Sequence, residues 1–455
     1  MFKFLFTTLP SNDLGLLTRS LPIAVELTQR GHTIAFCSPA KAPKKLIHQT
    51  GFVNLTPPHP LYYINPNDIS LKGMLRLIMS NPMKSYKIGR IKFLLKLLQA
   101  MPRKLAPQTS EVWNMDHAFA MAGLMNINFI RANCDAYIKM IQSFEPDILI
   151  DFWNPFACIA ANTLKIPLIS VMQADQHPAN KGLIWWKVPP DNIPSALPAI
   201  NKVLTQYGLK TVLKVEELSL GDLTLIVGSP ETELIKEKIE GIFIGPILWQ
   251  SKHADLPKWL NKLNDDKPLI WVYSGNPRYT SKSTVFDSEL ILSTSIRALA
   301  DEDIHVILTT GHHALPDELL PLPGNFNFEP YVPGLVLAER CDLMIHHGGY
   351  GSCQTGLFCG TPAVIIPTFS ERESNARRVA LLGAGEFILP ETDSSGNRYI
   401  STAKFKRIIK QVLATSSYKE KAGYYSKKLR SYGGVEYAVQ LIETFTEERL
   451  KRNGG

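Results

Sequence analysis

The sequence lacks several features that mark common classes of protein. It holds six cysteines in 455 residues, and no two have the C-x-x-C spacing of zinc sites and redox motifs. No window approaches the ~18 uninterrupted apolar residues of a membrane-spanning helix. No G-x-G-x-x-G follows the first strand-like run, which argues against a dehydrogenase. We therefore expect reduced thiols and a cytoplasmic location.

Acidic residues are absent from one basic segment. Residues 69–104 contain six lysines, three arginines and no acid, so they account for the whole net charge of +8. Leucines recur at helical spacing beside Lys92 and Lys96. The segment is therefore either a solvated helix face or an amphipathic surface for peripheral contact with an anionic membrane or acceptor. Nucleic acid is not an expected partner, because aromatic residues for base stacking are few in this segment.

The remaining composition is that of an ordinary globular protein. Apolar residues make up 45% of the chain and charged residues 20%. A chain of this length exceeds a single hydrophobic core, so we expect two domains. The first residues, MFKFLFTTLPSNDLG, have a short apolar run that threonine and proline interrupt, which predicts a first β-strand and not a signal peptide.

Strand-like runs alternate with helical patterns in two series, as in parallel sheets flanked by helices. The runs are KFLFTTL, TIAFCSP, PDILIDFW and PLISVMQ in the first series, and PLIWVYSG, HVILTTG, LMIHHGG and AVIIPTF in the second. Glycine, proline and polar residues cluster between the series at 245–255. We predict an α/β protein with two Rossmann-like domains and a ligand-binding cleft between them. The predicted boundaries are an N-terminal domain at 1–245, a C-terminal domain at 246–430 and a final helix at 431–455 that packs back on the N-terminal domain.

One glycine-rich stretch, LMIHHGGYGSCQTGLFCG, runs from a buried strand into a helix predicted to begin around Ser352. Glycines permit a tight turn, and the first turn of a helix offers free N–H groups to an anion. His347 and Ser352 can add hydrogen-bond donors to a diphosphate. Alternatively, the glycines only make a turn, and the histidines form hydrogen bonds with nearby groups of the protein instead of a ligand. Glu371, beyond the next strand, can accept hydrogen bonds from sugar hydroxyls.

The segment from FEPYVPGLVLAERCDLMIHHGGYGS through GTPAVIIPTFSERESNARRVALLGAG resembles the nucleotide-sugar signature of the family 1 glycosyltransferases, the UDP-glycosyltransferase superfamily of GT-B fold, in its bacterial natural-product branch. More weakly, GLLTRSLPIAVELTQRGH resembles the first helix of that family, and IGPILW resembles its interdomain linker. The resemblance implies inverting transfer of a sugar from a UDP- or dTDP-sugar to a small, hydrophobic acceptor, with neither a metal nor another cofactor.

The resemblance also assigns residues to the donor site. Tyr331 stands where the family usually has a tryptophan that stacks on the base, and Gly334 replaces its usual glutamine. Arg372 replaces another common glutamine. Either its charge selects a donor sugar that carries a carboxylate, or its side chain points away from the sugar. The positions implied to bind the donor are Gly275, Asn276, Tyr331, Val332, His347, Gly349, Gly351, Ser352, Glu371 and Arg372.

The N-terminal domain departs from the family at its general base. A histidine normally follows the glycine of the first loop, whereas Leu16 follows Gly15 here. Asp151 matches the aspartate that orients that histidine, and Asp13 lies three residues before Leu16. Either a carboxylate, Asp13 or Asp151, replaces the imidazole as catalytic base, or the chain is a non-catalytic nucleotide-sugar-binding auxiliary protein.

Acceptor contacts are expected from residues 60–135 and from the loop QADQHPANKGLIWW. Its Trp185 and Trp186 either line an apolar acceptor pocket or serve only packing. A nucleotide-sugar epimerase of the same fold is a further alternative, although it would not need an apolar acceptor region.

Overall fold

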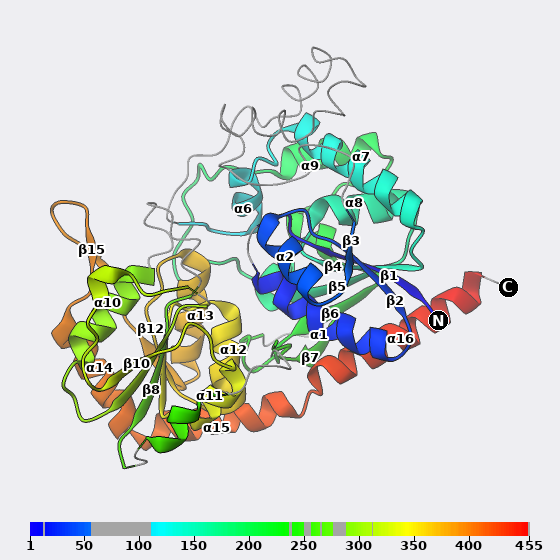
Figure 1. Ribbon diagram of the computed structural model, residues 1–455. Helices are drawn as coiled ribbons and strands as arrows, with labels where there is room; N and C mark the ends of the chain where they lie inside the picture. The colour runs from blue at the N-terminus through cyan, green and yellow to red at the C-terminus, as the bar shows by residue number, and fades with distance from the viewer. Residues whose placement is uncertain are drawn as a thin grey trace. The chain divides into compact units, whose positions relative to one another are not determined.

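The computed structural model describes residues 1–11, 14–55, 111–235, 239–249, 256–263, 266–275, 288–311 and 313–453. The basic segment 69–104 lies outside these residues, as do Asp13 and Asn276. The chain divides into two units (Figure 1). Unit 1 comprises Met1–Val227, Lys238–Ile247 and Gly434–Gly455, and unit 2 comprises Gly228–Glu237 and Leu248–Gly433.

A seven-stranded parallel sheet in the order β3-β2-β1-β4-β5-β6-β7 forms the centre of unit 1. Most strand residues are buried apolar side chains, as expected when helices cover both faces of a parallel sheet. The strands are β1 (Lys3–Thr8), β2 (Thr33–Cys37), β3 (Val53–Asn54), β4 (Ile148–Phe152), β5 (Leu168–Gln173), β6 (Leu223–Val227) and β7 (Ile242–Gly245).

The strand order of unit 1 reverses between β1 and β4, where the carboxyl ends of α/β sheets bind ligands. Thr7 and Asp151 are direct partners in the register of these two strands. The predicted catalytic aspartate of β4 therefore lies at the switch point of the sheet.

Three helices of unit 1, α6, α7 and α8, begin at asparagines. The side chains of Asn114, Asn126 and Asn154 accept backbone N–H groups at these three helix starts, which satisfies donors that would otherwise lack partners. The helices of unit 1 are α1 (Gly15–Gln29), α2 (Lys41–Gln49), α6 (Met115–Met121), α7 (Ile127–Phe144), α8 (Pro155–Leu164), α9 (Leu197–Gln206) and α16 (Gly434–Asn453).

The C-terminal helix α16 packs against α1 in unit 1 (Figure 1). Glu443 of α16 accepts hydrogen bonds from Arg30 Nη1 and pairs with His32 Nε2, each at 2.9 Å. Arg449, further along α16, pairs with Asp222 at 2.9 Å. These contacts join the last described helix to the first part of the chain.

Unit 2 has a six-stranded parallel sheet in the order β10-β9-β8-β11-β12-β13. Alternate residues of β8 point to opposite faces: Ile270 and Val272 join one apolar core, while Leu269 and Trp271 join the other. The strands are β8 (Leu269–Tyr273), β9 (His305–Thr309), β10 (Phe326–Phe328), β11 (Leu343–His346), β12 (Ala363–Ile365) and β13 (Gly385–Phe387).

Helices cover both faces of the unit 2 sheet, and its strand order reverses between β8 and β11. The carboxyl ends of β8 and β11 therefore lie beside each other at the switch point. The helices are α10 (Ser288–Leu299), α11 (Gly334–Arg340), α12 (Tyr350–Cys359), α13 (Ser370–Leu381), α14 (Thr402–Ala414) and α15 (Ser416–Arg430). A hairpin of β14 (Glu391–Thr392) and β15 (Arg398–Tyr399) follows β13.

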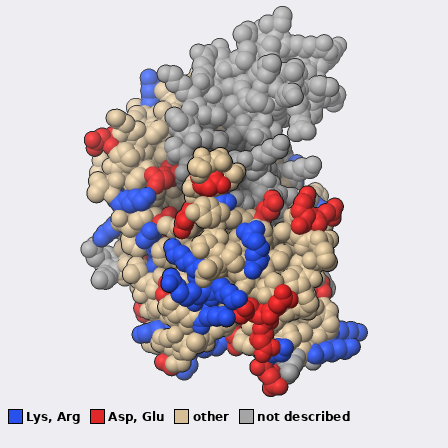
Figure 2. All heavy atoms as spheres, turned by 90° about the vertical axis from the view of Figure 1, so that its left-hand side faces the viewer, with Lys and Arg blue, Asp and Glu red and all other residues tan. Residues whose placement is uncertain are grey.

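Basic side chains gather on one face of the molecule (Figure 2). Helix α14 of unit 2 carries four basic residues and no acid: Lys404, Lys406, Arg407 and Lys410. Glu302 pairs with both Lys406 and Lys410, so part of this charge is compensated within unit 2.

The predicted architecture of two Rossmann-like parallel sheets is confirmed. All eight strand-like runs form strands, but β3, β6, β7, β10 and β13 were not predicted. All of these except β6 have four residues or fewer, so their sequence signal is weak. The helix expected to begin around Ser352 begins two residues earlier, at Tyr350. In the described part of the chain, no helix combines the length and apolar character needed to cross a bilayer.

Candidate functional site

The glycine turn after β11 has a backbone that only glycine fits. Gly348 has φ +85°, and a Cβ there would lie 2.7 Å from the carbonyl oxygen of Arg372. A Cβ on Gly349 would lie 2.5 Å from Nε2 of His347. Both glycines therefore allow the chain to turn closely around the His347 ring and against the start of α13.

The imidazole of His347 is held on several sides. Its ring meets Tyr273 edge-on, with 5.5 Å between the ring centroids. A Cβ on Gly275, whose φ is +88°, would lie 3.1 Å from Nδ1 of His347. Gly275 and Gly349, which follow different strands, thus both leave space for this ring.

His347 is neutral at physiological pH. Burial holds the pKa of His347 well below its ordinary value, and the charges of Arg372 and His346 lower it further. Its side chain is 8% exposed. A neutral imidazole carries one N–H, so His347 can donate one hydrogen bond to a ligand oxygen.

The neighbouring His346 has a structural role, because it supports the backbone of the glycine turn. Its side chain is fully buried, and Nδ1 accepts a hydrogen bond of 3.1 Å from the backbone N–H of Gly348. Burial lowers the pKa of His346 to about 3. His346 therefore stabilises the glycine turn, as the alternative interpretation expected of both histidines.

Helix α12 begins directly after the turn. The carbonyl oxygen of Gly349 accepts hydrogen bonds from the N–H groups of Ser352 and Cys353, so Ser352 is the third residue of the helix. The space around a Cβ on Gly351 is open. The first turn contains no acidic residue, and its N–H groups and positive dipole end suit an anion.

The start of α13 lies against the same turn. Glu371 accepts a hydrogen bond of 2.8 Å from Nδ2 of Asn375, and the same amide donates to the carbonyl oxygen of Gly348 at 2.9 Å. Glu371 and Arg372 are both half-buried. One asparagine thus ties the predicted sugar-binding carboxylate to the glycine turn.

The residues predicted to bind the base precede α11. Tyr331 is half-buried and Val332 is 5% exposed. A Cβ on Gly334 would lie 3.2 Å from Cη2 of Trp271, so the indole ring packs tightly against this glycine. The indole N–H of Trp271 donates to Thr309 at 2.9 Å, which fixes the ring.

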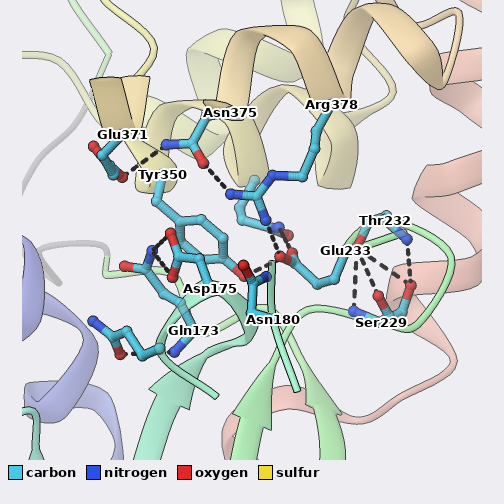
Figure 3. A network of polar contacts seen from close by, with 12 residues as sticks. Gln173, Asp175, Asn180, Ser229, Thr232, Glu233, Tyr350, Glu371, Asn375 and Arg378 are labelled. Atoms are coloured by element: carbon cyan, nitrogen blue, oxygen red, sulfur yellow. Dashed lines mark hydrogen bonds and ion pairs between the residues drawn. The ribbon is translucent and has the colours of Figure 1, made fainter. Parts of the chain in front are cut away.

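A buried carboxylate, Glu233, lies behind the glycine turn and was missed by the sequence analysis. It forms an ion pair of 2.5 Å with Arg378 and accepts hydrogen bonds from Tyr350 Oη at 2.9 Å and Gln354 Nε2 at 3.0 Å (Figure 3). Arg378 lies in the stretch NARR, but its partner is 145 residues away in the sequence. The only sequence signal was a polar turn, GSPETE, after the β6 strand.

Asp151 of unit 1 is almost completely buried, at 1% exposure. Its Oδ1 accepts from Thr7 Oγ1 at 2.5 Å, and its Oδ2 accepts from the N–H of Asn154 at 2.9 Å and from Cys158 Sγ at 3.3 Å. Burial raises the pKa of Asp151 to about 6, although these hydrogen bonds favour the carboxylate. The group is therefore a buried carboxylate that titrates near neutrality.

The other predicted residues of unit 1 are placed as follows. Leu16 is 5% exposed in the first turn of α1. Trp185 and Trp186 are half-buried and meet edge-on, with 5.5 Å between ring centroids. The carbonyl oxygen of Trp113 accepts from the N–H groups of Leu183 and Ile184, which anchors the tryptophan loop.

The structure thus brings together Gly275, His347, Gly349, Glu371 and Arg372 in unit 2. It places Asp151 at the switch point of the unit 1 sheet. Among the described residues, no group of three or more His, Cys, Asp and Glu side chains is arranged to hold a metal ion. Metal independence stays a prediction.

Comparison with known proteins shows which proteins this chain resembles. Residues 293–431 match the model of the erythromycin biosynthesis protein CIII-like C-terminal domain. An uncharacterized UDP-glucosyltransferase of Bacillus subtilis, YojK, is 29% identical over 228 residues, which are 50% of this chain and 52% of the relative. The 4'-demethylrebeccamycin synthase of Lentzea aerocolonigenes is 32% identical over 202 residues, 44% of either chain. The chain is thus similar in sequence to glycosyltransferases of family 1. It aligns with about half the length of these first two relatives.

The fold comparison covers more of the chain than the sequence matches. CalG4, the calicheamicin glycosyltransferase, has a TM-score of 0.67 with 18% identity over 98% of each chain. The spinosyn rhamnosyltransferase SpnG, solved with spinosyn aglycone, has a TM-score of 0.65 with 16% identity over 97% of this chain and 99% of its own. The chain therefore has the GT-B fold of these structures.

Proposed function

We propose that the protein is an inverting glycosyltransferase that binds a nucleoside diphosphate sugar in unit 2. The observation that carries the proposal is the convergence of three elements: the glycine turn around a neutral His347, the N-terminus of α12, and Glu371 at the start of α13. Each supplies what one part of the donor needs, namely close backbone approach, a positive dipole end and an acceptor for sugar hydroxyls.

The reaction is a single displacement at the anomeric carbon. An acceptor oxygen forms the new bond while the bond from that carbon to the diphosphate oxygen breaks, and the acceptor proton passes to a base. Negative charge grows on the leaving diphosphate, where the α12 N-terminus and the donors of His347, Ser352 and Asn276 stabilise it. The scheme uses no metal ion and no other cofactor.

Two aspartates are candidates for the base, Asp13 and Asp151. The bonds from Thr7, Asn154 and Cys158 occupy both oxygens of Asp151, which supports a positioning role for it. Asp13 lies three residues in sequence before Leu16, the position where the family has its histidine. We therefore rank Asp13 first as the proton acceptor.

The acceptor is proposed to be a small apolar molecule bound to unit 1. Trp185 and Trp186 form an anchored aromatic pair that can pack on such a molecule. Solved relatives of the same fold suggest donors to test: SpnG and VinC have been solved with thymidine diphosphate, and YojK is named a UDP-glucosyltransferase.

A second candidate function is nucleotide-sugar binding without catalysis, as an auxiliary protein. The observation that favours it is Leu16, which is buried at the family's histidine position and has no group that accepts a proton.

One experiment separates these candidates. Purified protein is incubated with a panel of UDP- and dTDP-sugars, and slow hydrolysis of the donor is followed by mass spectrometry. An enzyme releases free sugar and nucleoside diphosphate from at least one donor. A protein that binds nucleotide but hydrolyses no donor and transfers to no apolar acceptor supports the auxiliary candidate.

A further inference from the structure

The loop after β6 carries a carboxylate that belongs to unit 2. Residues Gly228–Glu237 fold with unit 2, although the strand before them is part of unit 1. Glu233 in this loop is 4% exposed, and its partner Arg378 on α13 is 7% exposed. Both charges are therefore removed from water, and each depends on the other for compensation.

Hydrogen bonds within the loop fix the backbone of Glu233. Ser229 and Thr232 exchange hydrogen bonds across a tight turn, and the N–H of Glu233 donates to the carbonyl oxygen of Ser229 at 2.9 Å. Gly228 has φ +95°, and a Cβ there would lie 2.6 Å from Oε1 of Glu233 and 3.0 Å from Oη of Tyr350. The absence of a side chain at Gly228 thus makes room for this pair of groups.

Glu233 reaches the glycine turn along two routes (Figure 3). On one route, Oε1 accepts the hydroxyl of Tyr350, the first residue of α12. Gln354, one helical turn later, donates to the same oxygen at 3.0 Å. The carboxylate therefore holds the inner side of the first turn of α12.

The second route passes through α13. Nη1 of Arg378 binds Oε2 of Glu233, and Nη2 donates to Oδ1 of Asn375, both at 2.5 Å. The amide of Asn375 then donates to the carbonyl oxygen of Gly348 and to Glu371. The guanidinium orients this amide, because Oδ1 must face Arg378 and Nδ2 must face the turn.

We infer that Glu233 and Arg378 are positioning residues for donor binding: together they hold the α12 N-terminus, the carbonyl of Gly348 and the Glu371 carboxylate in one fixed arrangement. This inference rests on the proposed donor site in unit 2. Neither residue needs to touch the donor. Their effect is to fix the groups that would bind the diphosphate and the sugar before the donor arrives, which lowers the entropic cost of binding.

The test compares two tyrosine variants that are matched in chemistry. Tyr350→Phe removes one hydrogen bond to Glu233. The control, Tyr432→Phe, removes a 3.3 Å hydrogen bond to Glu231, a second carboxylate of the same loop. Binding of dTDP and UDP is measured by calorimetry, and hydrogen exchange is measured at the amides of residues 347–352.

We expect Tyr350→Phe to weaken binding of the preferred nucleotide ~10-fold, because a hydrogen bond to a buried charged group is lost. Exchange at residues 347–352 should become faster even without nucleotide. Tyr432→Phe should change neither quantity. Unchanged affinity and unchanged exchange in Tyr350→Phe would overturn the inference.

A second variant separates positioning from general stability. Arg378→Lys keeps a positive charge for Glu233, but a single ammonium cannot reproduce the fork that also binds Asn375. The variant should fold and still bind nucleotide more weakly, with a larger loss for the complete nucleotide sugar than for the bare nucleotide, because Glu371 is no longer fixed. Equal losses for both ligands, or none, would count against the second route.

The outcomes also distinguish the inference from the function on which it rests. A wild-type protein that binds no nucleoside diphosphate overturns the proposed donor site, and the inference with it. A wild-type protein that binds normally, alongside Tyr350→Phe and Arg378→Lys variants that bind equally well, overturns the inference alone.

Discussion

Ionisation of Asp151 should destabilise unit 1, so the stability of this unit should fall as the pH rises. Replacement of Asp151 by asparagine should remove this dependence of stability on pH. Burial raises the pKa of Asp151 from 3.8 to about 6 in the folded state. The folded protein therefore holds this proton more tightly than the unfolded chain does. The stabilisation from the protonated form is complete below pH 3.8 and is lost as the pH rises through about 6.

The pKa difference sets the size of this effect. The whole shift is equivalent to about 3 kcal/mol of unfolding free energy. Between about pH 5 and about pH 8, the free energy of unfolding of the wild type should fall by about 1 kcal/mol relative to that of Asp151→Asn. The asparagine keeps the local geometry, because its carbonyl can face the N–H of Asn154 while the hydroxyl of Thr7 rotates to accept from its amide.

Native-state hydrogen exchange at the amides of β1 and β4 measures the free energy of unfolding of unit 1. Thr7→Val should move the midpoint of the pH dependence upward, because the Thr7 hydroxyl donates to the carboxylate and favours its charged form. If the difference in unfolding free energy between the wild type and Asp151→Asn stays constant from about pH 5 to about pH 8, this account of the buried carboxylate is refuted.

Three further predictions concern the reaction and the donor. Asp13→Asn or Asp151→Asn should lower turnover ~100-fold or more with nearly unchanged donor affinity if that residue is the base, and full transfer activity in both variants would place the base elsewhere. Gly349→Ala should weaken nucleotide binding ~10-fold or more, because its Cβ displaces the His347 ring, whereas Gly423→Ala, with open space around its Cβ in α15, should not. Arg372→Gln should change the ranking of donor sugars more than the affinity for the bare nucleotide; equal changes would mean that the guanidinium does not meet the sugar.

The fold was largely predictable because its signals are local. Runs such as LIWVY and AVI are β-branched or apolar throughout, which is typical of strands buried on both faces. The glycines after β11 were also informative, since a positive φ at Gly348 leaves few alternatives to glycine. The helix start was placed two residues late, because Gly349 itself takes the extended conformation before the first helical residue.

The unpredicted part of the site depends on contacts between distant segments. Nothing near Glu233 in the sequence indicates that its carboxylate lies beside Arg378, and nothing near Arg378 indicates that Asn375 joins it to Gly348. The raised pKa of Asp151 likewise follows from its burial, which the sequence PDILIDFW does not reveal by itself. Such networks arise only when the tertiary structure assembles them.

The central claim is that the glycine turn with His347 forms the diphosphate site, and titration calorimetry with UDP and dTDP tests it most directly. The wild type should bind at least one of them. His347→Ala should bind it ~10-fold more weakly or worse with an intact fold, because a donor to a charged oxygen is lost. His305→Ala, at the amino end of β9 in the same sheet, should bind like the wild type. Wild-type affinity in His347→Ala would contradict the assignment of this turn.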